Sequence, residues 1–124
     1  MTIEALEYIN KCMKELSIPY EFMEWTTGLS FPYFIGEYTD IEPINEDGMC
    51  SATFMLTGTT NKSYLTLESI KEKLKDYFTD TGRTAILDSG SGVAVSYLTS
   101  FPVPTGEQGL KRIQINLNIK EWRI

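Results

Sequence analysis

The sequence predicts an α+β fold in which a mostly antiparallel sheet of four to five strands carries two amphipathic helices on one face. Residues 2–17 and 66–79 repeat apolar side chains at three- and four-residue steps, which is the period of a helix with one buried side. Elsewhere, apolar and polar residues alternate in segments joined by short turns, which is typical of neighbouring antiparallel strands. A length of 124 residues suits one domain over residues 1–124.

The first helix is expected over residues 2–17. Thr2 is the expected N-cap, because a threonine hydroxyl can accept a hydrogen bond from a free amide of the first turn. Pro19 ends the helix, and the following IPYEFMEW is expected to be a short extended piece. The expected apolar face of the helix consists of Ile3, Leu6, Ile9, Met13 and Leu16.

Two antiparallel strands and a protruding acidic loop are expected over residues 31–59. Residues 31–39 are aromatic and β-branched, and residues 49–59 alternate apolar with hydroxyl side chains. The Asp47-Gly48 pair between them is typical of a hairpin turn. The acids of this expected loop are Asp40, Glu42, Glu46 and Asp47.

The second half of the chain predicts a helix followed by two or three strands. Thr66 is the expected N-cap of the helix over residues 66–79. Strands are expected over residues 84–87 and 92–101, joined by the turn DSGSG. The most regular alternation runs from Lys111 to Lys120 and predicts a strand with one buried face and one polar face.

Both cysteines are expected to be buried, reduced thiols. Cys12 falls on the apolar stripe of the first helix, and Cys50 lies in an alternating strand. Two cysteines without any histidine are too few ligands for a zinc site.

Charge is distributed unevenly along the chain, whose net charge is −6. Eight acids and no base lie between Lys14 and Lys62, whereas the last fourteen residues carry four bases and one acid. Two interpretations stay open: solvated faces, or copies of the chain that meet head to tail, acidic patch against basic strand. The net negative charge argues against general affinity for nucleic acid.

The residue types argue against catalysis. Without histidine, the commonest general base and the usual serine or cysteine triads are absent. The acids of the loop lack the spacing of a calcium-binding EF-hand, and Glu46 and Asp47 are adjacent rather than opposed across a substrate. The glycines of DSGSGV are followed by no lysine and no expected helix, so a phosphate loop is not predicted. We expect neither an enzyme nor a cofactor.

Core packing or a subunit interface is a better expectation for the aromatic residues than stacking on nucleic acid, and Trp122 either docks on a neighbouring chain or caps the core. Tyrosine and phenylalanine are enriched in the cores of protein interfaces, and the aromatic run at residues 31–38 is surrounded by acids rather than by bases. The candidate interface residues are Phe31, Tyr33, Tyr38, Lys111, Arg112, Lys120, Trp122 and Arg123.

The stretch PYFIGEYTDIEPINEDGMCSATFMLTGTTNKSYLTLESIKEKLKDYF resembles small neck proteins of tailed phages and prophages. Its aromatic-Gly-Glu-Tyr strand, Glu-Asp-Gly turn, Phe-Met-Leu-Thr-Gly strand and lysine-rich helix are most similar to the tail terminator, or tail-to-head joining, family. The resemblance implies an α+β fold assembled as a hexameric ring. It further implies that the ring caps the tail tube, stops tail polymerisation and joins the head while DNA passes through its channel, with no catalytic residue or cofactor. In such a ring, we expect Asp40, Glu42, Glu46 and Asp47 to face the channel or a partner ring.

This resemblance implies a virion protein, assembled in the host cytoplasm, whose partners are its own copies, the tail-tube protein and a head connector. No membrane span is expected, because no stretch reaches the 18 or so apolar residues that one needs. Alternatives remain: a head-completion or stopper ring, or a small cytoplasmic α+β module that binds a peptide or small molecule. An enzyme that uses carboxylates alone comes last.

Overall fold

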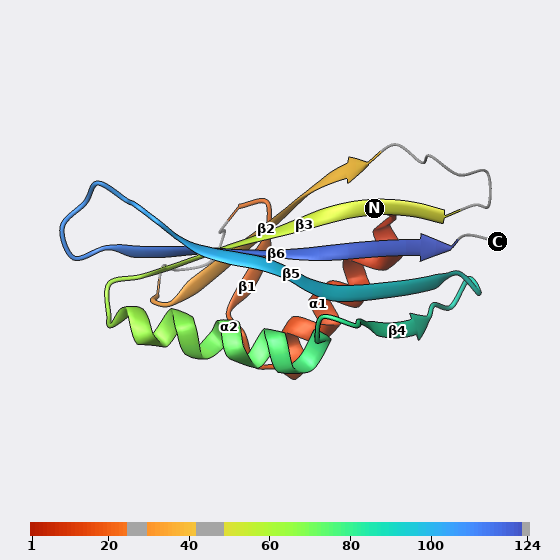
Figure 1. The fold of residues 1–124 in the computed structure, drawn as a ribbon, viewed down its shortest axis with the longest axis horizontal. Coiled ribbons are helices and arrows are strands. Elements are labelled where there is room, and N and C mark those ends of the chain that lie inside the picture. The colour runs from red at the N-terminus through yellow and green to blue at the C-terminus, as the bar shows by residue number, and fades with distance from the viewer. Residues whose placement is uncertain (25–29, 42–48, 123–124) are drawn as a thin grey trace.

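The computed structural model describes residues 1–24, 30–41 and 49–122. Within these ranges the chain is an α+β fold with two helices and one six-stranded sheet (Figure 1). The elements in chain order are α1 (Ile3–Glu15), β1 (Tyr20–Phe22), β2 (Tyr33–Ile41), β3 (Met49–Thr60), α2 (Tyr64–Phe78), β4 (Arg83–Ile86), β5 (Gly92–Val103) and β6 (Lys111–Trp122). The strands lie in the order β1-β2-β3-β6-β5-β4, so β6 sits inside the sheet between β3 and β5.

The sheet is mostly antiparallel, as predicted, but the prediction of four to five strands is wrong. The extended piece after Pro19 forms β1, an edge strand that runs parallel to β2. Backbone hydrogen bonds hold it there: the Phe34 amide donates to the Pro19 carbonyl (2.9 Å), and the Met23 amide donates to the Gly36 carbonyl (2.8 Å). Three residues are too few to show the alternation by which a strand is recognised in sequence.

Each helix begins directly after a residue whose side chain caps its first turn. Thr2 caps α1 as predicted, with its hydroxyl accepting from the Ala5 amide (3.1 Å). The prediction of Thr66 as the cap of α2 is wrong, because the Ser63 hydroxyl accepts from the Leu65 amide (3.2 Å) and the helix begins at Tyr64. Serine is as good a cap as threonine, so the sequence offered two candidates within one turn.

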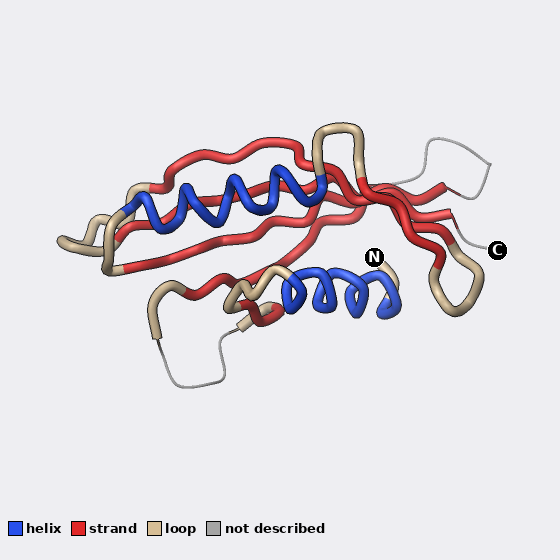
Figure 2. The backbone as a smooth tube through the Cα atoms, turned by 90° about the horizontal axis from the view of Figure 1, so that it is seen from below, coloured by secondary structure: helices blue, strands red, loops and turns tan. Residues whose placement is uncertain are grey.

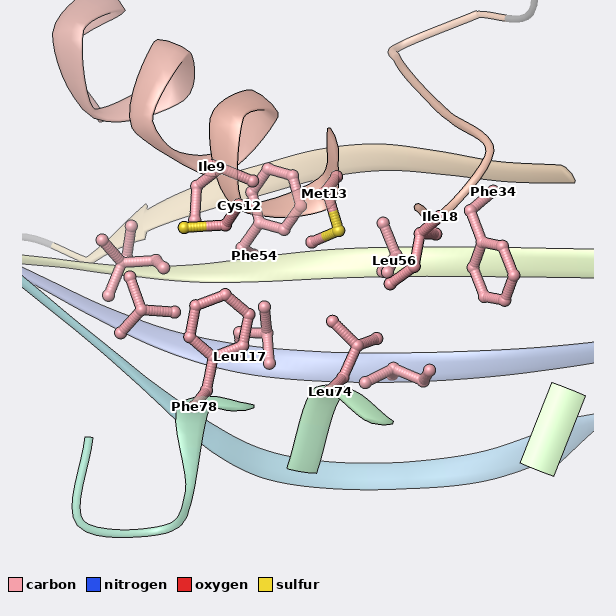
Figure 3. Close-up of a cluster of buried hydrophobic side chains, with 14 of the residues drawn as sticks. Ile9, Cys12, Met13, Ile18, Phe34, Phe54, Leu56, Leu74, Phe78 and Leu117 are labelled. Atoms are coloured by element: carbon pink, nitrogen blue, oxygen red, sulfur yellow. The ribbon is translucent and has the colours of Figure 1, made fainter. Parts of the chain in front are cut away.

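One core joins both helices to one face of the sheet. Alternate residues of the long strands point into it, and Figure 3 shows Phe54 and Leu117 meeting Ile9, Met13 and Phe78 from the helices. α2 contacts β3, β5 and β6. Figures 1 and 2 show both helices on the same side of the sheet, with α2 along one half and α1 along the other.

Two glycines let aromatic rings lie directly on the neighbouring strand. A Cβ atom at Gly58 would lie 2.2 Å from Cε2 of Phe34, and one at Gly36 would lie 2.5 Å from Cζ of Phe54. Both rings are fully buried, so they have no room to move away. Glycine is therefore required at these positions for packing rather than for backbone conformation.

Gly58→Ala is expected to lower the free energy of unfolding by about 1–3 kcal/mol, the usual cost of overpacking. Gly92→Ala is the matched control, because a Cβ there would meet its nearest atom, Cε3 of Trp122, at an ordinary 3.7 Å. Urea unfolding followed by circular dichroism measures both. Equal effects of the two substitutions would contradict the role of the Phe34 ring.

Candidate functional site

One face of the sheet carries no described helix or strand, and we call it the bare face. Its side chains come from the outward positions of β2, β3, β5 and β6 and include three charged residues, Glu37, Arg112 and Lys120. About half of the others bear side-chain hydroxyl or amide groups, and the rest include the apolar Ile35, Met55, Phe101 and Val103. The hydroxyl and amide residues include Thr39, Ser51, Thr53, Thr57, Thr59, Ser96, Thr99, Gln114, Asn116 and Asn118.

Hydrogen bonds link some of these polar side chains. The Asn116 amide of β6 donates to the Thr99 hydroxyl of β5 (3.1 Å), and the Gln114 amide donates to the Asn116 carbonyl oxygen on the same strand (3.0 Å). The first of these bonds is a cross-strand pair and the second runs along β6.

One end of the bare face is apolar. In the strand register, Met49, Trp122, Gly92 and Ile86 form a row across β3, β6, β5 and β4. The neighbouring row contains Ile41 and Lys120. Ile86 is 79% exposed, Ile41 47% and Trp122 41%, although all three are large and apolar. We call this surface the Trp122 patch and define it as Ile41, Met49, Ile86, Lys120 and Trp122.

On the helix side of the sheet, a groove of about 460 Å³ opens between α1 and the edge strand β1. Its apolar residues include Ile3, which is 76% exposed, and Phe22, which is 38% exposed. Three of its described lining residues are acids and none is basic, and alternation with Tyr20 and Phe22 directs the Glu21 side chain to the other side of the sheet. This α1–β1 groove is lined by Ile3, Leu6, Glu7, Asn10, Tyr20, Glu21, Phe22 and Glu24.

Only one of the four predicted loop acids lies within the described residues. Asp40 is exposed near the end of β2, and its carboxylate pairs with the α-amino group of Met1. Glu42, Glu46 and Asp47 lie outside the described residues. Their exposure to a channel or partner stays a prediction.

The structure separates the predicted interface aromatics. Tyr33 lies at an outward position of β2, and its ring packs against Phe31, with ring centroids 5.7 Å apart. Tyr38 lies on the helix side, where it stacks on Phe22 at 6.1 Å and packs against the core. Phe31, Tyr33 and Tyr38 are all half-buried within one copy.

The predicted basic residues of β6 also divide between the two faces. Lys120 is exposed on the bare face, and Arg112 on the same face donates from Nε to the Thr59 hydroxyl (3.3 Å). Lys111 points to the helix side by alternation. Trp122 lies on the bare face with Lys120, whereas Arg123 lies outside the described residues.

A buried carboxylate was missing from the predicted sites. Glu121 is only 3% exposed and accepts hydrogen bonds from the Thr2 hydroxyl (2.9 Å) and the Thr2 amide (3.2 Å). Thr2 therefore both caps α1 and links this helix to β6 by hydrogen bonds to Glu121. The alternation of β6 contains the signal, because Glu121 continues the inward series of Ile113, Ile115, Leu117 and Ile119.

Cys12 is buried as predicted, but the prediction for Cys50 is only partly right. Burial raises the pKa of the Cys12 thiol above its ordinary value, so little of it is the reactive thiolate at neutral pH. Cys50 is half-buried, because it lies near the end of β3, where the sheet gives less cover.

Within the described residues, no group of three or more histidine, cysteine, aspartate or glutamate side chains is placed to hold a metal ion. Neither described helix is both long and apolar enough to cross a membrane. Neither the protein-family models nor the curated protein sequences match the chain.

Thr2→Ala is expected to lower the free energy of unfolding by about 2–3 kcal/mol, because it removes a helix cap and leaves one oxygen of the buried Glu121 carboxylate without its hydroxyl donor, while the amide of residue 2 still donates to the other. Ser63→Ala is the control, since it removes only the cap of α2 and is expected to cost about 1 kcal/mol. Thr2→Ser should keep most of the stability. Equal losses for Thr2→Ala and Ser63→Ala in chemical denaturation would argue against the Glu121 contact.

The two cysteines are expected to react at different rates with a thiol reagent at about pH 8, near the ordinary pKa of a free thiol. Cys50 should be labelled readily, and Cys12 should be labelled only as fast as the protein opens, because its thiol is buried and its pKa is raised. Peptide mass spectrometry after timed alkylation assigns each rate. Denaturant should equalise the two rates, and equal labelling of the native protein would refute the burial of Cys12.

Proposed function

We propose that the chain is a structural, non-enzymatic subunit of the neck of a tailed phage. It forms a homohexameric ring that caps the tail tube, ends tail polymerisation and joins the tail to the head. The partners of the ring are the tail-tube protein and a head connector, and DNA passes through the ring without specific binding. The protein then acts only in assembly of the particle and uses no cofactor.

The observation that carries this proposal is a pair of unlike surfaces on one small domain. A closed ring needs heterologous interfaces, in which one patch meets a different patch on the next copy. The Trp122 patch is apolar with a lysine, and the α1–β1 groove is apolar with acids in its lining. The two surfaces lie on opposite sides of the sheet.

The composition of the bare face is compatible with a channel for DNA. It offers hydroxyl and amide groups and only two bases among its described residues, so it lacks the clustered lysine and arginine that hold phosphates. We further propose that the acids of residues 42–47 face the lumen or a partner ring, where like charge would repel the DNA backbone. Asp40 of the same segment lies instead on the helix side and pairs with the α-amino group of Met1.

The resemblance to tail terminators supports the same function. It implies an α+β fold with a mostly antiparallel sheet packed on helices, and the chain has that fold. Fold alone does not assign a function, so the proposal depends on the unlike surfaces and on the experiment below.

Phage particles made without this protein are expected to carry tails of variable, extended length, because nothing then stops the addition of tail-tube rings. Supply of the protein in trans should restore one length. Electron microscopy of negatively stained tails gives the length distribution. Tails of one normal length that fail to join heads would overturn termination and point to a connector or stopper.

A further inference from the structure

We propose that the α1–β1 groove of one copy receives the Trp122 patch of the next copy, with Lys120 set among the carboxylates of the groove. This inference rests on the proposed ring and assigns its subunit contact. In such a ring, another copy of the chain covers the exposed apolar surface on each side of the sheet.

Apolar exposure is the first argument. Ile86, Ile41 and Trp122 are exposed by 79%, 47% and 41%. Trp122 and Ile86 lie in one row with only Gly92 between them, and Ile41 lies on β2 in the next row, across β3 from Lys120. Clustered apolar exposure of this kind marks an interaction site. An exposed tryptophan is also the residue type that most often anchors a protein interface.

The groove has matching dimensions and chemistry. Its volume of about 460 Å³ lies within the range of roughly 300–1,000 Å³ of pockets that enclose a ligand. Ile3, Leu6 and Phe22 offer it apolar contacts, so the groove can enclose one large side chain such as an indole. Burial of this apolar area on both copies would drive the association.

Charge selects the partner and its orientation. Lys120 is the only charged residue in the two described rows that form the Trp122 patch, and Asp80 lines a pocket with Lys120 and Trp122 beside these rows. Glu7 and Glu24 belong to the groove, whose described lining contains no base. Opposite charges steer the two surfaces together, and a groove facing another groove would be repelled.

Position excludes a contact within one copy. The groove is formed by α1 and β1 on the helix side, and the Trp122 patch lies on the bare face, so the sheet separates them. Each copy therefore offers both halves of the contact to different neighbours. Repetition of one such heterologous contact gives a closed ring when the rotation between copies closes.

Charge reversal tests the contact. Glu24→Lys and Lys120→Glu each place like charges together, and both positions are exposed, so the fold should survive. Sedimentation velocity from micromolar to millimolar concentration, with native mass spectrometry, is expected to show association of the wild type that each reversal weakens about tenfold or more. Lys62→Glu is the matched control, because it changes the same charge at an exposed site outside both surfaces and should associate as the wild type.

An equimolar mixture of the two reversed variants is the decisive sample. In an alternating assembly, the introduced lysine and the introduced glutamate meet at one contact, and the native Lys120 and Glu24 meet at the next, so every contact has opposite charges. The mixture is expected to recover the wild-type association, with the two variants present in equal number in each complex. Failure of the mixture to recover, or wild-type association of either single variant, would overturn the contact.

The same samples separate this inference from the proposed function. Wild-type protein that forms hexamers, alone or on purified tail tubes, while both reversals also form them, would overturn the groove contact and leave the ring intact. Wild-type protein that neither associates at millimolar concentration nor binds tail tubes would overturn both. Trp122→Ala should weaken association, and thermal unfolding of the single copy measures the packing lost at the same time, because the side chain is only 41% exposed. Unchanged association would count against the contact.

Discussion

The position of α1 between the two edges of the sheet is the constraint on which the rest of the structure depends. The edge strands β1 and β4 are three and four residues long, and each leaves one side without a strand partner among the described residues. α1 lines the surface beside both, and its Glu4 accepts hydrogen bonds from the Ser89 hydroxyl (2.6 Å) and amide (3.1 Å) in the turn after β4. Short edges held beside a helix are poor templates for unwanted strand pairing. β1 pairs only with residues 34–36 of β2, and β4 pairs only with residues 92–95 of β5, so the outer edges of residues 37–41 and of β5 beyond Val95 carry no described strand.

The periodicity of apolar residues predicted most of this fold, because it is a local property of the sequence. α1, α2 and the four longest strands show their helical or alternating pattern over nine residues or more, long enough for the pattern to be unambiguous. β1 was missed as a strand because its pairing depends on β2, which reaches it only through tertiary structure. The start of α2 was displaced because Ser63 and Thr66 are both good caps, and local sequence does not choose between them.

The candidate surfaces were predicted less completely, for a related reason. The uneven charge along the chain indicated two unlike patches, and alternation places Lys120 and Trp122 on one face of β6. Their neighbours Ile41 and Ile86 come from strands whose register against β6 no local pattern reveals. The α1–β1 groove was missed altogether, because it exists only where a helix passes an unexpected edge strand. The burial of Glu121 could have been predicted from the sequence, because this residue occupies an inward position in a regular alternation.

The central place of β6 has a consequence for the order in which the protein can fold. A ribosome adds β6 after β3 and β5, yet β6 joins these two strands, so until it emerges the sheet exists as two separate halves. Thr2, the cap of α1, also waits for β6, because its hydrogen-bond partner Glu121 lies 119 residues further along the chain. Pairing over such separations is slow, and the unjoined halves expose their apolar faces in the meantime. The nascent chain therefore stays incomplete, and in need of protection from its neighbours, until β6 is made.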